Sequence, residues 1–292
     1  PVDVHLLDGT YELFRHHFAV PSRVDADGIE IAAARGVVNT VFMMLEEGAT
    51  HLAVATDHTV ESFRNDLFDG YKTGDGIDPD LFGQFPIIED ALDAFGVRVL
   101  PMDEYEADDG LASGARVARS DPRVGRVFLC TPDKDLAQCV EGDRVVQLDR
   151  RRGELRDADG VREKFGVDPA SIPDWLALTG DTADGFPGLP GWGAKSSAVV
   201  LTRYAHIEAI PFDPADWDIT VRGAARLAAT LEEQIEDAHL FRDLATLRDD
   251  AAVGTVDDWC WRGPTAGFDR WSERLGLGRL TERIATLAAS RA

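Results

Sequence analysis

Nine carboxylates in this sequence stand in short clusters, and most of these clusters follow an apolar run that is typical of a buried strand. In an open parallel sheet, ligands bind outside the carboxyl ends of the strands. Carboxylates gathered there would repel one another unless cations neutralised them, and clustered oxygen ligands favour Mg²⁺ or Mn²⁺. The pattern therefore predicts a metal site that cleaves phosphate esters. The nine residues are Asp8, Asp57, Glu106, Asp108, Asp109, Asp133, Asp135, Asp181 and Asp184.

The clusters differ in how specific they are. Asp8 or Asp57 alone is as typical of a turn or a helix cap as of a metal site. The acids at residues 106–109 stand at a predicted helix start, where the helix dipole explains one of them but does not need all three. Asp133 and Asp135 follow the most apolar strand, although this spacing also occurs in phosphatases that use an aspartyl nucleophile.

Residues 180–198 carry the most specific motif. Its first half supplies two acids three residues apart, and its second half is a glycine turn that opens a helix. Gly191 and Gly193 allow close backbone approach, and a helix N-terminus can receive a phosphate. Lys195 and Ser196 would add hydrogen-bond donors to that phosphate site.

Hydrophobic periodicity predicts an α/β fold with a central, mainly parallel sheet flanked by helices. From about residue 157 the pattern changes to helices and Gly/Pro turns, so we expect a core at residues 1–170 and a helical part at residues 171–292. The glycine-rich segment 71–84 predicts a mobile loop or a short helical lid, and the tail from Trp259 predicts a helical cap. The expected strands are residues 4–7, 51–56, 97–100, 126–131 and 145–148.

Composition limits the classes of function. The net charge is −23, with 53 acidic and 30 basic residues, which opposes nucleic-acid binding unless the bases gather on one face. No apolar run approaches the roughly 20 residues of a membrane span, and no signal peptide is expected. The 3 cysteines are widely spaced, which argues against disulfides or zinc and favours the cytoplasm.

Taken together, these motifs resemble the structure-specific 5′ nucleases, a family that includes flap endonucleases, phage 5′ exonucleases and the 5′-nuclease domain of bacterial DNA polymerase I. The resemblance covers residues 2–250 and rests on Asp8-Gly9, Tyr-Glu-Ala-Asp-Asp, Thr-Pro-Asp-Lys-Asp, and Gly-Asp-X-X-Asp before the glycine turn. It implies a PIN-like core, a helix-three-turn-helix that grips duplex DNA, and an arch at residues 71–84.

The resemblance also implies roles for individual residues. All nine acids match the family's metal ligands, while Lys72 and Arg64 match basic residues that offset charge on the scissile phosphate. Tyr71 falls on the base of the arch. The DNA-contacting turn of the helix-three-turn-helix, which resembles a potassium-binding loop, contains Gly191, Gly193, Lys195 and Ser196.

Three departures from the family pattern stand out. Asp75 occupies a position that usually carries a second basic residue, which puts the preference for a threaded 5′ flap in doubt. Ala183 and Gly185 replace a serine and an asparagine around Asp184, so a hydroxyl and an amide donor are missing near the metal site. Trp192 stands where a small aliphatic residue is common.

The expected function is 5′-3′ exonuclease or flap endonuclease activity on DNA with two or more Mg²⁺ or Mn²⁺ ions. A 5′ flap, a 5′ end or a gapped duplex would be the substrate, with an RNA–DNA hybrid as a further candidate. We expect a monomer that acts alone or with a separate DNA polymerase. Two alternatives stay open: a structure-specific DNA-binding protein with impaired catalysis, and a different Mg²⁺ phosphohydrolase.

Overall fold

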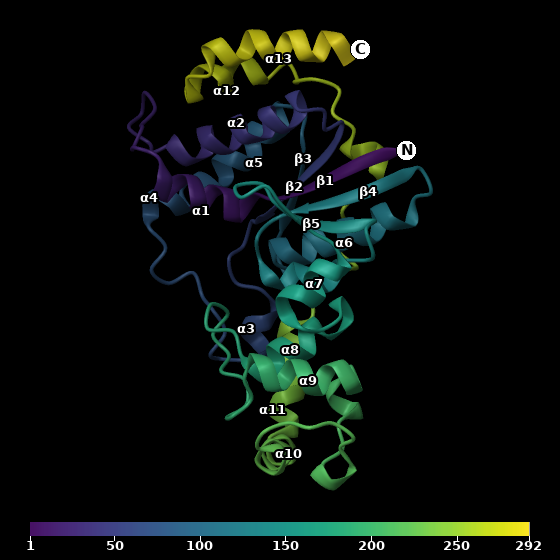
Figure 1. Ribbon diagram of the computed structural model, residues 1–292. Coiled ribbons are helices and arrows are strands. Elements are labelled where there is room, and N and C mark those ends of the chain that lie inside the picture. Colours follow the sequence, from purple (N-terminus) through teal and green to yellow (C-terminus); the bar gives the residue numbers. More distant parts are fainter. Residues whose placement is uncertain (292) are drawn as a thin grey trace. The chain divides into compact units, whose positions relative to one another are not determined.

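The computed structural model describes residues 1–291, which divide into two compact units (Figure 1). Unit 1 comprises Pro1–Val60, Gly74–Thr131 and the C-terminal segment from Arg248. Unit 2 comprises Glu61–Thr73 and Pro132–Leu247. The boundary predicted near residue 170 divides the chain once, whereas each of these units is made of separate segments. The predicted boundary stays a prediction.

A parallel sheet forms the centre of unit 1, with strand order β3-β2-β1-β4. Its strands are apolar because both faces are covered by helices; Val4, Leu6 and Leu7 of β1, for example, are fully buried. Four of the predicted strands are thereby confirmed. Their bounds are β1 Val2–Asp8, β2 His51–Asp57, β3 Arg98–Met102 and β4 Val124–Cys130.

Helices cover the two faces of this sheet (Figure 1). On one side lie α1, α2 and α5, and α6 packs across all four strands on the other. α2 turns an apolar stripe toward the core, since Val38, Phe42 and Leu45 are fully buried. Within the predicted arch at residues 71–84, α4 is helical and α5 begins at the last residue, Gln84. The bounds are α1 Gly9–Ala19, α2 Ala32–Glu46, α4 Pro79–Phe82, α5 Gln84–Ala94 and α6 Ala107–Ser120.

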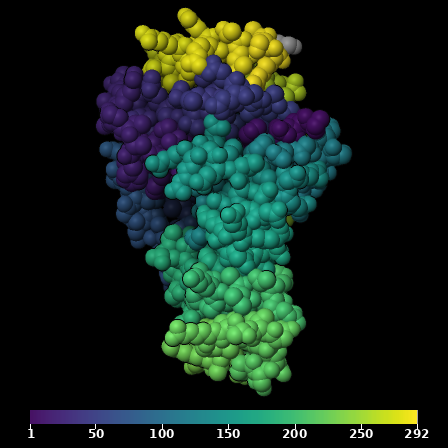
Figure 2. All heavy atoms as spheres, viewed as in Figure 1, coloured from purple at the N-terminus to yellow at the C-terminus, as the bar shows by residue number. Residues whose placement is uncertain are grey.

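The C-terminal segment completes unit 1. Its helices α12 (Phe268–Leu275) and α13 (Gly278–Arg291) form a layer over α2, drawn in yellow in Figures 1 and 2. Trp259 is 1% exposed and Trp261 is 3% exposed, so they pack in the core as predicted rather than offering faces for base stacking. Residue 292, the last of the predicted cap, lies outside the described residues.

Unit 2 is mainly helical. α8 packs against α9 and α11 around a core that includes Leu176 and Leu201, and the one predicted strand here, β5, pairs antiparallel with β6, which was not predicted. The predicted helical region 222–247 is two helices, α10 and α11. The bounds are α3 Phe63–Leu67, β5 Val145–Asp149, β6 Glu154–Arg156, α7 Ala158–Phe165, α8 Ile172–Thr179, α9 Ala194–Tyr204, α10 Ala224–Glu233 and α11 Ile235–Ala245.

Among residues 1–291, no helix combines the length and the apolar character that crossing a membrane requires.

Trp259 tests how far the C-terminal segment stabilises unit 1. Its ring is buried and its Nε1 donates a hydrogen bond to the Val253 carbonyl at 2.9 Å. We expect Trp259→Ala to lower the free energy of unfolding by about 3 to 5 kcal/mol, the usual range for a large core side chain. Urea unfolding followed by circular dichroism measures this change. Phe18→Ala is the control, since Phe18 is 77% exposed and should change stability by less than about 0.5 kcal/mol.

Candidate metal site and phosphate-contacting residues

In unit 1, the predicted carboxylates lie where strands end and helices begin. Asp8 ends β1 and caps α1, because its Oδ1 accepts a hydrogen bond from the Tyr11 backbone N–H at 2.9 Å. Its Oδ2 accepts from the Thr131 hydroxyl, just after β4, at 3.0 Å. Asp57 ends β2 and accepts from the Ala107 N–H at the start of α6 at 2.7 Å. These contacts bring the ends of three strands and the start of α6 together, as the sequence predicts.

The start of α6 also assigns a role to Asp109. This carboxylate is fully buried, and its two oxygens accept the backbone N–H groups of Glu106 and Arg248, each at 2.8 Å. Both oxygens are therefore engaged in closing the helix start and fixing the C-terminal segment, which favours a structural role. Its predicted metal ligation stays a prediction, as does that of its neighbours Glu106 and Asp108.

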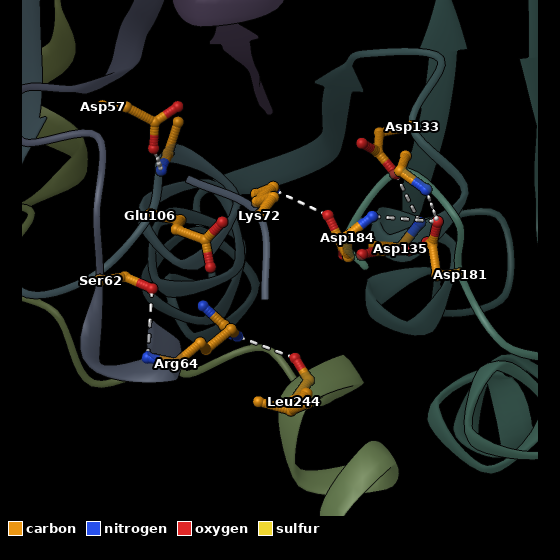
Figure 3. Close-up of polar contacts among 12 residues, drawn as sticks. Asp57, Ser62, Arg64, Lys72, Glu106, Asp133, Asp135, Asp181, Asp184 and Leu244 are labelled. Atoms are coloured by element: carbon orange, nitrogen blue, oxygen red, sulfur yellow. Dashed lines mark hydrogen bonds and ion pairs between the residues drawn. The ribbon is translucent and has the colours of Figure 1, made fainter. Parts of the chain in front are cut away.

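In unit 2, three predicted carboxylates converge. Ligand oxygens of Asp135, Asp181 and Asp184 lie within 4.8 Å of one another, and all three residues are buried (Figure 3). Asp135 stands on the 3₁₀ helix Lys134–Cys139, and the other two belong to the turn that follows α8. These three carboxylates thus form one cluster within unit 2, and their predicted metal ligation stays a prediction.

Two lysines compensate part of this negative charge. Lys72 Nζ lies 2.8 Å from Asp184 Oδ1, and Lys134 Nζ lies 2.6 Å from Asp181 Oδ2. Although desolvation lowers the pKa of Lys134, its hydrogen bond to Asp181 and the charge of Asp135 outweigh that effect and raise it. Lys134 therefore stays charged, and each of the two lysines contacts a different carboxylate.

Neither lysine forms such a short contact with Asp135. Its Oδ1 is buried and has no hydrogen-bond partner among residues 1–291. Desolvation, followed by the charges of Asp133 and Asp184, raises the pKa of Asp135 well above its ordinary value. A buried carboxylate oxygen without a donor is costly unless a cation approaches it. The set of hard oxygen ligands around it fits Mg²⁺ or Mn²⁺.

The backbone around Lys72 is fixed to the same turn. The Lys72 N–H donates to the Asp184 carbonyl at 2.9 Å, and Asn65 Nδ2 donates to the Lys72 carbonyl at 2.8 Å. Gly185 has φ +93°, and a Cβ at this position would overlap the carbonyl oxygen of Gly70. Glycine at 185, one of the departures from the family pattern, is therefore what permits the segment that carries Lys72 to approach Asp184.

Arg64 and Tyr71 are buried, unlike Lys72. Arg64 is 1% exposed and donates from Nε to the Leu244 carbonyl at 2.8 Å and from Nη2 to the Thr246 carbonyl at 3.1 Å, at the end of α11 (Figure 3). Tyr71 is 4% exposed within the hydrophobic core of unit 2. Their predicted phosphate and DNA contacts stay predictions, and their surroundings favour packing roles.

In the glycine turn 191–193, between α8 and α9, most residues are exposed and one side chain, that of Trp192, is buried. Gly191, with φ +83°, Gly193 and Lys195 are exposed, and the Gly193 N–H donates to Ser196 Oγ at 3.0 Å. Trp192 is 4% exposed and its Nε1 donates to the Leu227 carbonyl at 3.2 Å, so this departure from the family pattern serves the core. The helix-three-turn-helix itself stays a prediction.

Sequence reasoning passed over two residues that the structure places at the site. Thr131 orients Asp8, and Asn65 holds the Lys72 carbonyl while its Oδ1 accepts the Ser62 N–H at 2.9 Å. Position offered a signal for Thr131, which directly precedes the Pro-Asp-Lys-Asp motif. Asn65 carried none, because its role depends on how residues 62–72 fold back on themselves.

Comparison with known proteins identifies the family. The model of the 5′-3′ exonuclease N-terminal, resolvase-like domain matches residues 3–166, and that of the 5′-3′ exonuclease C-terminal SAM fold matches residues 167–266. This chain belongs to the 5′-3′ exonuclease family. The predicted family and its α/β core with a helical C-terminal part are thereby confirmed.

Two relatives place this 5′-3′ exonuclease family member among curated proteins. It is 34% identical over 268 residues to DNA polymerase I of Pseudomonas aeruginosa, covering 88% of this chain and 28% of the polymerase. It is 32% identical over 209 residues to the 5′-3′ exonuclease of Aquifex aeolicus, covering 71% of each protein. The chain thus spans between a quarter and a third of the length of the polymerases it matches.

Solved structures share the fold of this exonuclease family member at low identity. The phage T5 5′-exonuclease with bound zinc ions is 18% identical, with a TM-score of 0.66, and the match covers 94% of this chain and 98% of that chain. The catalytic core of Rad2 in complex with DNA is 16% identical, with a TM-score of 0.65, covering 98% and 93%. At these identities the likeness establishes the fold alone.

Asp135→Asn tests the uncompensated carboxylate. A carboxyl whose pKa is raised in the folded state binds more protons when folded, so metal-free stability falls as the pH rises above the ordinary value of 3.8. In EDTA we expect the neutral variant to be more stable than the parent by about 1 to 3 kcal/mol at about pH 8, with a smaller gain at about pH 5. Urea unfolding at both values measures the difference. Equal stabilities at both values would contradict the assignment.

Gly185→Ala tests the close approach of the Lys72 segment. We expect a loss of more than about 1 kcal/mol in unfolding free energy, because the methyl group combines left-handed strain with overlap on Gly70. The matched control is Gly142→Ala in the same unit, where φ is +53° and a Cβ has open space. Thermal unfolding of both variants separates strain from overlap, and equal losses would show that the contact with Gly70 is unimportant.

Proposed function

We propose that this protein is a divalent-metal-dependent 5′-3′ exonuclease and flap endonuclease that hydrolyses DNA phosphodiesters. One observation carries the proposal: a buried cluster of three carboxylates, one with an unsatisfied oxygen, adjoins an exposed lysine in a chain of the 5′-3′ exonuclease family. A binding protein without catalysis has no use for such a cluster, since the carboxylates destabilise the fold in the absence of cations.

Asp135, Asp181 and Asp184 are the proposed ligands in unit 2, with Asp133 beside them in sequence. From the sequence motifs, Asp8, Asp57, Glu106 and Asp108 are the proposed ligands that unit 1 supplies. Two bound Mg²⁺ or Mn²⁺ ions would supply an activated water and stabilise the leaving oxygen of an in-line displacement. The glycine turn 191–193 is the proposed site for K⁺ and a DNA phosphate.

Lys72 is the proposed phosphate contact. Its side chain is 41% exposed while its ammonium group lies on Asp184, so it can reach a phosphate at the edge of the carboxylate cluster. A fixed positive charge there offsets negative charge that develops on the phosphate during hydrolysis. Arg64 contributes indirectly in this proposal, because it fixes α3, the helix that precedes the Lys72 segment, to the end of α11.

A DNA end or junction is the proposed substrate: a 5′ flap, a free 5′ end or a gapped duplex, with an RNA–DNA hybrid as a further candidate. The polymerase I relatives support the proposal that the protein works beside DNA synthesis. In those relatives, a matching region is part of a chain about three to four times as long. A polymerase acting on the same DNA is therefore the proposed partner.

The test uses a 5′-flap duplex labelled at either end, incubated with Mg²⁺, Mn²⁺ or EDTA. We expect metal-dependent cutting near the junction, lost by at least about a hundredfold in Asp135→Asn and in Lys72→Ala, since each removes a group that acts on the reacting phosphate. The matched control is Asp216→Asn, an exposed acid of the same unit, which should cut like the parent.

The outcomes separate the candidate functions. Binding of the flap duplex without cutting in either metal would reject the nuclease and favour a DNA-binding protein with impaired catalysis. Cutting of simple phosphate monoesters but not of DNA would favour a different Mg²⁺ phosphohydrolase. Cutting that survives in Asp135→Asn would refute the assignment of the cluster while leaving the nuclease in place.

A further inference from the structure

An arginine-lined pocket lies in unit 1, apart from the carboxylates discussed above. Its volume is about 510 Å³, and it opens where the turn between α12 and α13 meets α2. Figure 1 shows these two helices lying over α2. Arg35 and Asn39 line it from α2, one helical turn apart, and Arg279 and Arg283 line it from α13.

Only one of the three arginines that line this pocket forms an ion pair among residues 1–291. Arg283 pairs with Glu46 and covers the ring of Phe42. The guanidinium groups of Arg35 and Arg279, by contrast, form no ion pair among residues 1–291. Two arginines that pair with no acid among the described residues thus line one pocket.

A third arginine strengthens the local charge. The guanidinium of Arg23 packs against Gly276, which lines the pocket. A residue larger than glycine at position 276 would have no room for its side chain. Arg23 likewise has no ion pair within the described part of the chain. Positive charges around one pocket repel one another, and an anion bound among them would reduce this repulsion.

The chemistry of the donors suits a phosphate. Arg35 Nε is buried and has no hydrogen-bond partner among residues 1–291, so it lacks the acceptor that a buried donor requires. The planar guanidinium fork binds phosphate oxygens in pairs. The first turn of α13, a helix of 14 residues, also borders the pocket through Gly278 and Arg279, and the positive end of its dipole adds to the attraction.

We propose that this pocket binds the phosphate group of a nucleotide. The volume accommodates one nucleotide, and the unpaired arginines supply donors for the several oxygens of a phosphate ester. The phosphate comes either from a free mononucleotide or from a nucleotide at the end of a strand. This site is separate from the carboxylates, so the proposal does not depend on the proposed nuclease activity.

The experiment measures binding by calorimetry in EDTA, so that no metal ion can recruit phosphate to the carboxylates. Three ligands are titrated: inorganic phosphate, a 5′-deoxymononucleotide, and a short single-stranded oligonucleotide. We expect Arg35→Ala/Arg279→Ala to weaken nucleotide binding by at least about tenfold, since two charge-assisted contacts are lost. The control Arg151→Ala/Arg222→Ala removes the same charge from exposed positions of unit 2 and should bind like the parent.

Each outcome decides the proposal. Stronger binding of the mononucleotide than of the oligonucleotide identifies a free ligand, and the reverse order identifies a strand end. Arg279→Glu, at an exposed position, guards against loss of folding in the double variant and should weaken binding on its own. Absence of binding to all three ligands at millimolar concentration, or equal weakening in the control, overturns the proposal.

Discussion

Repulsion among carboxylates is the constraint on which the rest of this structure depends. A fold that gathers acids at strand ends and in one buried turn must stabilise them without relying on solvent. The two units do so in different ways. In unit 1, backbone N–H groups at helix starts donate hydrogen bonds to Asp8, Asp57 and Asp109. In unit 2, Lys72 and Lys134 each hold one carboxylate of the cluster.

The two solutions have different chemical consequences. A carboxylate whose oxygens accept backbone N–H groups is fixed in place and has less capacity left for a cation, as Asp109 illustrates. A carboxylate held by a lysine can exchange that partner for an ion, because a lysine side chain is long and mobile. Asp135 has neither kind of partner at Oδ1, so it is the point of the cluster where a cation gains most.

Sequence patterns predicted the features that depend on residues close to one another in the chain. The strands of unit 1 follow from apolar spacing, and Asp181 and Asp184 stand in one turn, where local structure keeps them close. The surroundings of Arg64, Tyr71 and Gly185 could not be predicted in this way. Arg64 meets carbonyls about 180 residues away in the chain, and Gly185 is needed because Gly70 approaches it. Family patterns supply residue types, whereas these contacts depend on tertiary packing.

The path of the chain between the units has a consequence for biosynthesis. The polypeptide passes from one unit to the other after residues 60, 73, 131 and 247. During translation, unit 1 therefore cannot be completed until its segment from Arg248 has been synthesised. This segment supplies Trp259, Trp261 and the Arg248 N–H that donates to Asp109. Unit 2 has all of its residues by Leu247, before unit 1 is complete. Until the segment from Arg248 has been synthesised, the nascent chain lacks the contacts that this segment makes with α2 and β2, and this is the stage at which a chaperone would matter most.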